Sequence, residues 1–321
     1  MDIHAANRLQ EAVLKKFRSS PLYREYIGID TLVDLMKLPL KIALLASFTG
    51  LSSLAPGALY QVQIDQSTWQ LEASPFACRL THQVPQFGTA VLERGAGEAL
   101  SFWLEPYQPG LVTGTAAVYA AAPAWRATQA SQQVESLDIR STSSKLELSE
   151  TGSAKVLAAL RAGMQPTLKA TDPGGQQAQV AVSAANFTPA YAQYTECLAQ
   201  LLPVNFNQIA RTAILYPPAQ WELSQASRER LELVKTYVET DRQVGKIYVD
   251  GHSDNQGRRL LNRDLSKRRA EEVSRYLMQL GISEDMLVTR YHGERYPVVE
   301  NNSPENRTRN RRVTVRLERI E

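Results

Sequence analysis

The sequence is poor in residues on which several classes of protein depend. It holds only two cysteines, Cys78 and Cys197, and four histidines among 321 residues. Two cysteines cannot build a four-cysteine metal site or a disulfide-dense domain, and the histidines lack the spacing of metal ligands. The formal net charge is only +3, which is too small by itself to indicate nucleic-acid binding. We therefore predict no metal site, no cofactor and no nucleic-acid partner.

A long hydrophobic run is also missing near the N-terminus. The apolar segment at 42–51 has about half of the roughly 20 residues that a membrane helix needs. Lysines precede it and small residues with Pro56 follow it, which is the order of a secretory signal. We interpret residues 1–58 as an extension followed by a signal-peptide-like segment that starts at Met36, and we expect an exported chain that begins near Leu59. A short buried helix is the alternative.

Export would place the two cysteines in an oxidising compartment. We expect Cys78 and Cys197 to form one disulfide there. It would close a loop of about 120 residues and contribute about 2–4 kcal/mol in the chain-entropy picture. Two free buried thiols are the alternative.

Residues 59–203 contain mostly strand patterns. Two helices are predicted in this region, one at 151–162 before Gly163 and one at 189–202 before Pro203. Short β-rich segments, separated by turn residues, lie at 60–64, 99–104, 116–119 and 179–182. We find no catalytic motif here, and we predict a β-rich domain with a few helices.

The pattern changes near residue 203 and predicts a second domain at 204–321. Strand patterns alternate with a helix capped by Ser224 and a long helix at 258–280 that ends at Gly281. The strands are predicted at 212–216, 246–250, 287–291 and 313–317. This alternation favours a two-layer α/β sandwich, so the whole chain is predicted to be α+β.

The helix at 258–280 carries an arginine on its apolar stripe. Arg269 lies on one i, i+4 row with Leu261, Leu265, Val273 and Leu277. A guanidinium on such a stripe is costly unless it is paired and hydrogen-bonded. The loop before the helix contains Asp254, so we predict a pocket for a zwitterion with Asp254 on one wall and Arg269 on the other. The alternative is that these two residues only pair with each other.

Residues 245–317 resemble the OmpA-like domain that binds peptidoglycan. The motifs that carry the resemblance are Gly251-His-Ser-Asp254, Leu265-Ser-Lys-Arg-Arg-Ala270 and Asn310-Arg-Arg-Val313. The resemblance implies that Asp254 and Arg269 hold the diaminopimelate of the stem peptide. It also implies a set of further pocket residues: Ser253, Asn255, Asn262 and Leu265.

Two positions depart from the pattern of that family. Ser253 stands where a threonine is usual, and it keeps the hydroxyl. The segment Tyr216-Pro-Pro-Ala219 stands where the family usually has a Phe-Asp-like or Phe-Asn-like segment that contributes to the pocket. We therefore expect one pocket contact to be weakened or replaced.

The N-terminal half is similar to the MotY family of flagellar motor proteins. The similarity rests on Trp69, the segment 74–82 (SPFACRLTH) and the segment 85–88 (PQFG). It implies a periplasmic structural protein in which a β-rich attachment domain docks to the flagellar basal body and to MotB-like and MotX-like stator proteins. The C-terminal domain would anchor the motor to peptidoglycan, and a ring oligomer is one implied assembly. The alternative is an outer-membrane-associated cell-envelope integrity protein unrelated to the flagellum.

A catalytic role has weak support. His252, Ser253 and Asp254 are the residue types of a hydrolytic triad, but consecutive side chains point apart and cannot form a relay. The basic run at 307–312 is interpreted as solvated or paired rather than as a nucleic-acid site. We predict that the protein is not an enzyme.

Overall fold

The computed structural model describes residues 57–126 and 128–320. The predicted extension and all but the last residues of the signal-like segment at 36–58 therefore lie outside the described residues. Within the described residues, none of the helices combines the length and the apolar character that crossing a membrane requires.

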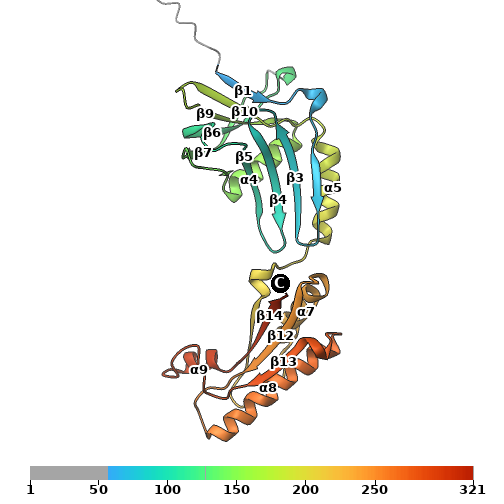
Figure 1. Ribbon diagram of the computed structural model, residues 1–321, viewed down its shortest axis with the longest axis vertical. Coiled ribbons are helices and arrows are strands. Elements are labelled where there is room, and N and C mark those ends of the chain that lie inside the picture. The colour runs from blue at the N-terminus through green and yellow to red at the C-terminus, as the bar shows by residue number, and fades with distance from the viewer. Residues whose placement is uncertain (1–56, 127, 321) are drawn as a thin grey trace, which may run out of the picture. The chain divides into compact units, whose positions relative to one another are not determined.

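Two five-stranded sheets form the first half of the described chain (Figure 1). One has the order β1-β10-β9-β6-β7, from β1 (Ala58–Gln61), β6 (Thr113–Ala121), β7 (Gln132–Ile139), β9 (Gln165–Thr171) and β10 (Gln177–Ala181). The other has the order β2-β3-β4-β5-β8, from β2 (Gln70–Ala73), β3 (Ala77–Val84), β4 (Gly88–Gly95), β5 (Leu100–Pro106) and β8 (Leu146–Glu147). All neighbouring strands are antiparallel except β1 and β10.

Two longer helices complete this half, α4 (Glu150–Arg161) and α5 (Phe187–Gln200). The Ser149 hydroxyl accepts a hydrogen bond from the Gly152 N–H and caps α4. Short 3₁₀ turns lie at Ile64–Gln66 and Ala124–Arg126. The two helices confirm the segments predicted from the stop signals at Gly163 and Pro203, with bounds shifted by one to two residues.

The predicted disulfide is present. Cys78 on β3 and Cys197 on α5 are bonded, with their Cα atoms 6.0 Å apart. Side chains on β3 alternate in burial, so that Cys78 and Leu80 point into the core that α5 covers. The bond joins the helix that ends this half to a strand near its beginning.

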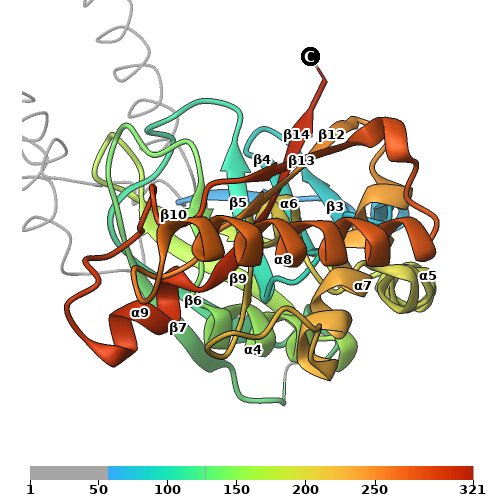
Figure 2. The same cartoon turned by 90° about the horizontal axis from the view of Figure 1, so that it is seen from below.

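A four-stranded sheet with the order β11-β14-β12-β13 forms the second half. Its strands are β11 (Arg211–Leu215), β12 (Val244–Gly251), β13 (Leu287–Tyr291) and β14 (Arg312–Arg319). The helices of this half are α6 (Phe206–Ile209), α7 (Gln225–Thr240), α8 (Arg259–Gln279) and α9 (Pro304–Asn310), with a 3₁₀ turn at Glu284–Met286. In Figure 2, α8 runs across the strands of the sheet, and it contacts β12, β13 and β14.

Apolar residues at alternate positions of the strands form the buried face of this sheet. Alternate residues of the strands, such as Ile214, Ile247 and Val315, join the core with residues of α7 and α8. The intervening residues lie on the opposite face. Ser224 caps α7 through the Ser227 N–H, and Gly281, with φ 100°, follows α8. The second half is a two-layer α/β unit, so the α+β prediction is confirmed.

The boundary predicted at 203/204 stays a prediction. The second hydrophobic core includes Ala96 from the first half, and Phe76 packs against it. The Leu202 N–H also donates to the Pro75 carbonyl oxygen at 2.9 Å. The two halves therefore share contacts at the predicted boundary.

We expect loss of the disulfide to destabilise the protein. Cys197→Ser should lower the free energy of unfolding by about 2–4 kcal/mol, because the unfolded chain regains the freedom of a long loop. Urea unfolding of the variant and the parent measures this difference. Two thiols that react in the unfolded, unreduced parent would contradict the bond, and Cys78→Ser should lower stability by a similar amount.

Candidate functional site

The loop after β12 is held close to α8 by a glycine. A Cβ added at Gly251 would lie 2.1 Å from the Ser266 carbonyl oxygen, so only glycine permits this approach. The next backbone groups are also bonded: the His252 N–H donates to the Arg312 carbonyl oxygen at 2.8 Å, and the Ser253 N–H donates to the Gly293 carbonyl oxygen at 2.9 Å. The backbone that positions the Asp254 side chain is therefore held in place by these hydrogen bonds.

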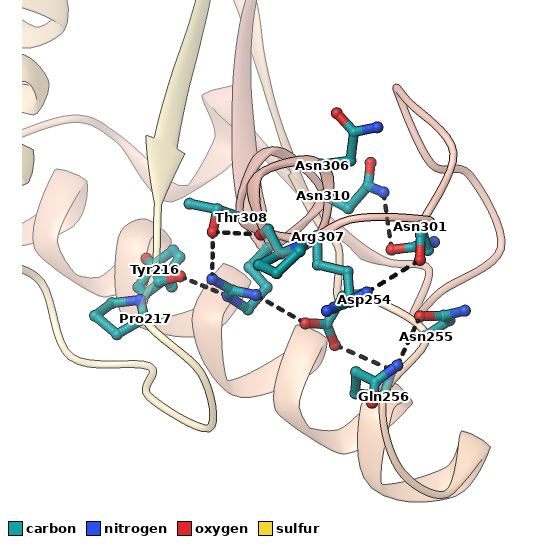
Figure 3. Close-up of polar contacts among 12 residues, drawn as sticks. Tyr216, Pro217, Asp254, Asn255, Gln256, Asn301, Asn306, Arg307, Thr308 and Asn310 are labelled. Atoms are coloured by element: carbon teal, nitrogen blue, oxygen red, sulfur yellow. Dashed lines mark hydrogen bonds and ion pairs between the residues drawn. The ribbon is translucent and has the colours of Figure 1, made fainter.

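Asp254 forms an ion pair with Arg311, and only 8% of each residue is exposed. The Arg311 Nη1 donates to the Asp254 Oδ2 at 2.9 Å. The same guanidinium donates from Nε to the Tyr216 carbonyl oxygen at 3.0 Å and from Nη2 to the Thr308 hydroxyl at 2.7 Å. Figure 3 shows Gln256 next to Asp254, and the Gln256 N–H donates to the Asp254 Oδ1 at 3.2 Å. These contacts offset the cost of burying both charges.

A cavity of about 620 Å³ opens beside this ion pair, and we call it the first cavity. Its charged lining residues are Asp254, Arg258, Arg307 and Arg311. Its apolar lining residues are Pro218, Ala219, Leu261, Leu265 and Pro304. The cavity thus combines a carboxylate, several guanidinium groups and an apolar wall.

Arg269 is not on the wall of the first cavity, which corrects the prediction from the helix pattern. Its side chain is fully buried, and each of its three guanidinium nitrogens donates to a backbone carbonyl. The Nε donates to Gln220 at 2.7 Å, the Nη1 to His252 at 3.2 Å and the Nη2 to Pro217 at 3.1 Å. Burial lowers the pKa of Arg269 to about 10, although Tyr216 and Asp254 oppose this shift.

The alternative pairing of Arg269 with Asp254 is also wrong in the described structure. Asp254 bonds to Arg311 instead, and backbone oxygens satisfy Arg269. The loop 217–220 supplies two of these oxygens, at the place where the sequence departs from its family. Arg269 does lie on the core-facing stripe, because Val273 and Leu277 on the same row are buried.

The other predicted pocket residues divide into two groups. Asn262 and Leu265 line the first cavity, and the Asn262 side chain donates to the Glu294 carboxylate at 2.7 Å. Asn255 is exposed and accepts from the Gln256 side chain at 3.3 Å, and it does not line the cavity. Ser253 is buried, and its hydroxyl has no partner among the described residues.

Arg311 is the site residue that the sequence reasoning did not single out. It lies in the Asn310-Arg-Arg-Val313 motif, at the junction between α9 and β14. Side chains of consecutive residues in an extended segment point to opposite sides. Arg311 therefore lines the first cavity, whereas Arg312 lines a different one on the other face of the sheet.

His252 is a buried neutral base next to these groups. Its Nδ1 has no partner among the described residues, and its ring stacks on His292 with 5.0 Å between centroids. Burial lowers the pKa of His252 to about 3, and the positive charge of Arg312 adds to this effect. Across the described part of the chain, no group of three or more histidine, cysteine or acidic side chains could hold a metal ion.

Comparison with known proteins identifies both halves of the chain. Residues 60–203 match the MotY N-terminal domain, and residues 215–311 match the OmpA family. Together these matches define a protein in which a MotY-type domain precedes an OmpA-family domain. The first of these matches confirms the resemblance to MotY that the N-terminal motifs predicted.

Curated relatives include the sodium-type flagellar protein MotY of Vibrio parahaemolyticus. It is 28% identical over 270 residues, which cover 83% of this chain and 92% of that protein. The peptidoglycan-binding protein ArfA of Mycobacterium tuberculosis is 36% identical over 113 residues, or 35% of this chain and 31% of that protein. Among solved structures, the C-terminal domain of Helicobacter pylori MotB is 23% identical with a TM-score of 0.32, and the match covers 34% of this chain and 85% of that one.

The burial of His252 predicts a loss of stability in acid. In the unfolded chain the histidine takes up a proton as the pH falls through about 6.5, whereas in the folded chain its pKa is about 3. Between these values the unfolded state binds more protons, so stability decreases as the pH falls, by at most about 1.4 kcal/mol per pH unit.

We expect His252→Asn to remove this part of the pH dependence. Urea unfolding of the parent and the variant between pH 7 and pH 4 compares the two slopes, and all other groups titrate in both proteins. Parallel curves would show that His252 is protonated equally in both states and would contradict the prediction.

Proposed function

We propose that the protein is a non-enzymatic structural component of the flagellar motor that anchors it to peptidoglycan. The observation that carries this proposal is the order of its two domains, which it shares with a flagellar MotY protein across most of both chains. The OmpA-family half supports the wall-binding part, because its relatives include proteins named for binding to or association with peptidoglycan.

We further propose a periplasmic location and a division of labour between the halves. The signal-like segment that starts at Met36 would direct export, and the Cys78–Cys197 disulfide fits an oxidising compartment. The β-rich half would attach to the basal body and to MotB-like and MotX-like stator proteins, with a ring as one assembly. The second half would then hold that assembly to the cell wall.

We propose that the first cavity binds the zwitterionic end of diaminopimelate. Asp254 would accept the ammonium group, because its Oδ1 is bonded only to the Gln256 N–H at 3.2 Å among the described residues. Arg307 and Arg311 would bind the carboxylate through hydrogens that their present contacts leave unused. Leu261 and Leu265 would cover the methylene chain of the ligand.

We propose that Arg269 supports this cavity as a positioning residue. It binds the carbonyl groups of Pro217 and Gln220, and the two residues between them, Pro218 and Ala219, line the cavity. It also bonds to the carbonyl of His252, two residues before Asp254. Loss of Arg269 would therefore disturb both sides of the cavity without a direct ligand contact. Ser253 and Asn255 would act on the ligand through the loop that contains Asp254.

Asp254→Asn is the sharpest test of the wall site. The substitution keeps the shape of the side chain but removes the charge that would bind an ammonium group. A charge-assisted hydrogen bond contributes about 1.5–3 kcal/mol, so co-sedimentation with purified peptidoglycan should weaken at least about tenfold. Thermal unfolding of the variant checks that it remains folded.

Arg268→Ala is the matched control for this test. Arg268 is exposed on α8, pairs with Asp264 and lies outside the first cavity. It should bind peptidoglycan like the parent. If the folded Asp254→Asn variant co-sediments as strongly as this control, the first cavity is not the wall site. Arg269→Ala should lose binding together with stability, because three buried carbonyls lose their donor.

A cell-envelope role unrelated to the flagellum is the second candidate. It is supported by the similarity of the second half to the peptidoglycan-associated lipoprotein of Pseudomonas putida, which is 37% identical over 71 residues. Cells in which the protein carries Asp254→Asn distinguish the two roles. We expect swimming in soft agar to decrease because the motor is not held to the wall, while resistance to detergent stays unchanged. Normal swimming with detergent sensitivity would favour the envelope role instead.

A further inference from the structure

The open face of the second sheet carries another cavity, which we call the second cavity. It has a volume of about 510 Å³ and lies on the side opposite the core formed with α7 and α8. Arg211 of β11, Arg309 of α9 and Arg312 of β14 all line it. β11 and β14 are neighbours in the sheet, and Leu215 pairs with Arg312 in their register. Three guanidinium groups from three separate elements therefore line one cavity.

The one acidic residue that lines the second cavity is already neutralised. Asp250 accepts from the Arg290 Nε at 2.6 Å and from the Arg290 Nη2 at 2.8 Å. The His292 Nε2 lies 2.9 Å from the same carboxylate. Burial favours the neutral acid, but the hydrogen bonds of Arg290 and His292 outweigh it and hold the pKa of Asp250 below its usual value. Asp250 thus already receives three hydrogen bonds, and one carboxylate beside three cavity arginines leaves the cavity with an excess of positive charge.

Arg312 has an unmet hydrogen-bonding group in this cavity. Only 7% of the residue is exposed. Its Nε donates to the Thr314 hydroxyl at 3.3 Å and its Nη2 donates to the Tyr296 carbonyl oxygen at 3.2 Å. Its Nη1 is buried and has no partner among the described residues. A desolvated cation without an acidic partner is costly, which indicates that an anion belongs nearby.

The positive charges of the two other cavity arginines are not paired with an acid of the described residues. Arg211 and Arg309 are exposed, and within residues 57–126 and 128–320 neither forms an ion pair or a side-chain hydrogen bond. Guanidinium groups match the oxygens of phosphate in a bidentate manner. A single carboxylate would neutralise one of three cations, whereas a phosphate ester or diphosphate brings about two or more negative charges.

We propose that the second cavity binds a multiply charged phosphate group through Arg211, Arg309 and Arg312. Its volume lies within the range of about 300–1,000 Å³ that is usual for small-ligand sites, so the phosphate can carry an organic substituent. The group can come from a soluble phosphate ester or from the headgroup of an anionic lipid. The second cavity is separate from the first, since Arg311 and Arg312 line different cavities.

A titration of the full chain with sodium pyrophosphate tests the proposal. Arginine Nε–Hε signals are followed by NMR, with sodium chloride at equal ionic strength as the reference. We expect saturable shifts of the Arg312 signal with pyrophosphate only. Arg309→Gln and Arg211→Gln should each weaken binding at least tenfold, because both side chains are exposed and the fold should not depend on them. Linear shifts without saturation, or equal affinity in these variants, would overturn the proposal.

Matched variants and probes separate the remaining outcomes. Arg268→Gln, outside the second cavity, should bind pyrophosphate like the parent, and Arg309→Gln should still co-sediment with peptidoglycan. Flotation with vesicles that contain phosphatidic acid, whose headgroup is a phosphomonoester, is compared with flotation of phosphatidylcholine vesicles. It identifies a lipid source if Arg309→Gln abolishes it, whereas binding of pyrophosphate alone identifies a soluble one. Citrate that binds as tightly as pyrophosphate would overturn the assignment to phosphate.

Discussion

The buried guanidinium of Arg269 joins three separate stretches of backbone, and the first cavity is built on them. It connects α8 to both ends of the loop 217–220 and to His252 after β12. A charge buried to this degree is tolerated only when its donors are satisfied, so each carbonyl is held where the guanidinium needs it. Asp254 and the lining residues Pro218 and Ala219 are thereby positioned from one point in the core.

The motif Asn310-Arg-Arg-Val313 places two consecutive arginines on opposite sides of the sheet. Asn310 is fully buried, and its amide group bonds to the backbone of Val298 and Val299, which fixes the end of α9. From that point the chain enters β14, where neighbouring side chains alternate in direction. Arg311 then pairs with Asp254 at the first cavity, while Arg312 enters the second. The basic run at 307–312, interpreted from the sequence as solvated or paired, thus contains the paired and buried Arg311.

Sequence patterns predicted the four longer helices and the disulfide, but they missed the short helices α6 and α9 and several strands. Helical spacing with caps identified α7, α8 and the place of Arg269 on the apolar stripe. β3 was missed although its side chains alternate, because its inward positions include Cys78 and His82, which are not typical strand-core residues. The partners of Arg269 could not be predicted either. Every residue has a carbonyl group, so a hydrogen bond to the backbone cannot be recognised from residue types. The prediction therefore placed Arg269 opposite Asp254 in a ligand pocket, with direct pairing of the two as the alternative.

The hydrogen bonds that each acid already accepts are the basis for proposing different ligands for the two cavities. In the first cavity, Arg311 takes the Oδ2 of Asp254, while the Oδ1 has one longer bond to the Gln256 N–H. That oxygen can still accept from an ammonium group, so a ligand with both signs of charge fits. In the second cavity, Arg290 and His292 occupy both oxygens of Asp250. Three of the roughly four acceptor positions of that carboxylate are used and its charge is paired with Arg290, so the arginines of the cavity favour an anion. A carboxylate beside a cavity therefore does not by itself make that cavity selective for cations. A ligand can use only those acceptor positions of the carboxylate that the protein's own donors leave free.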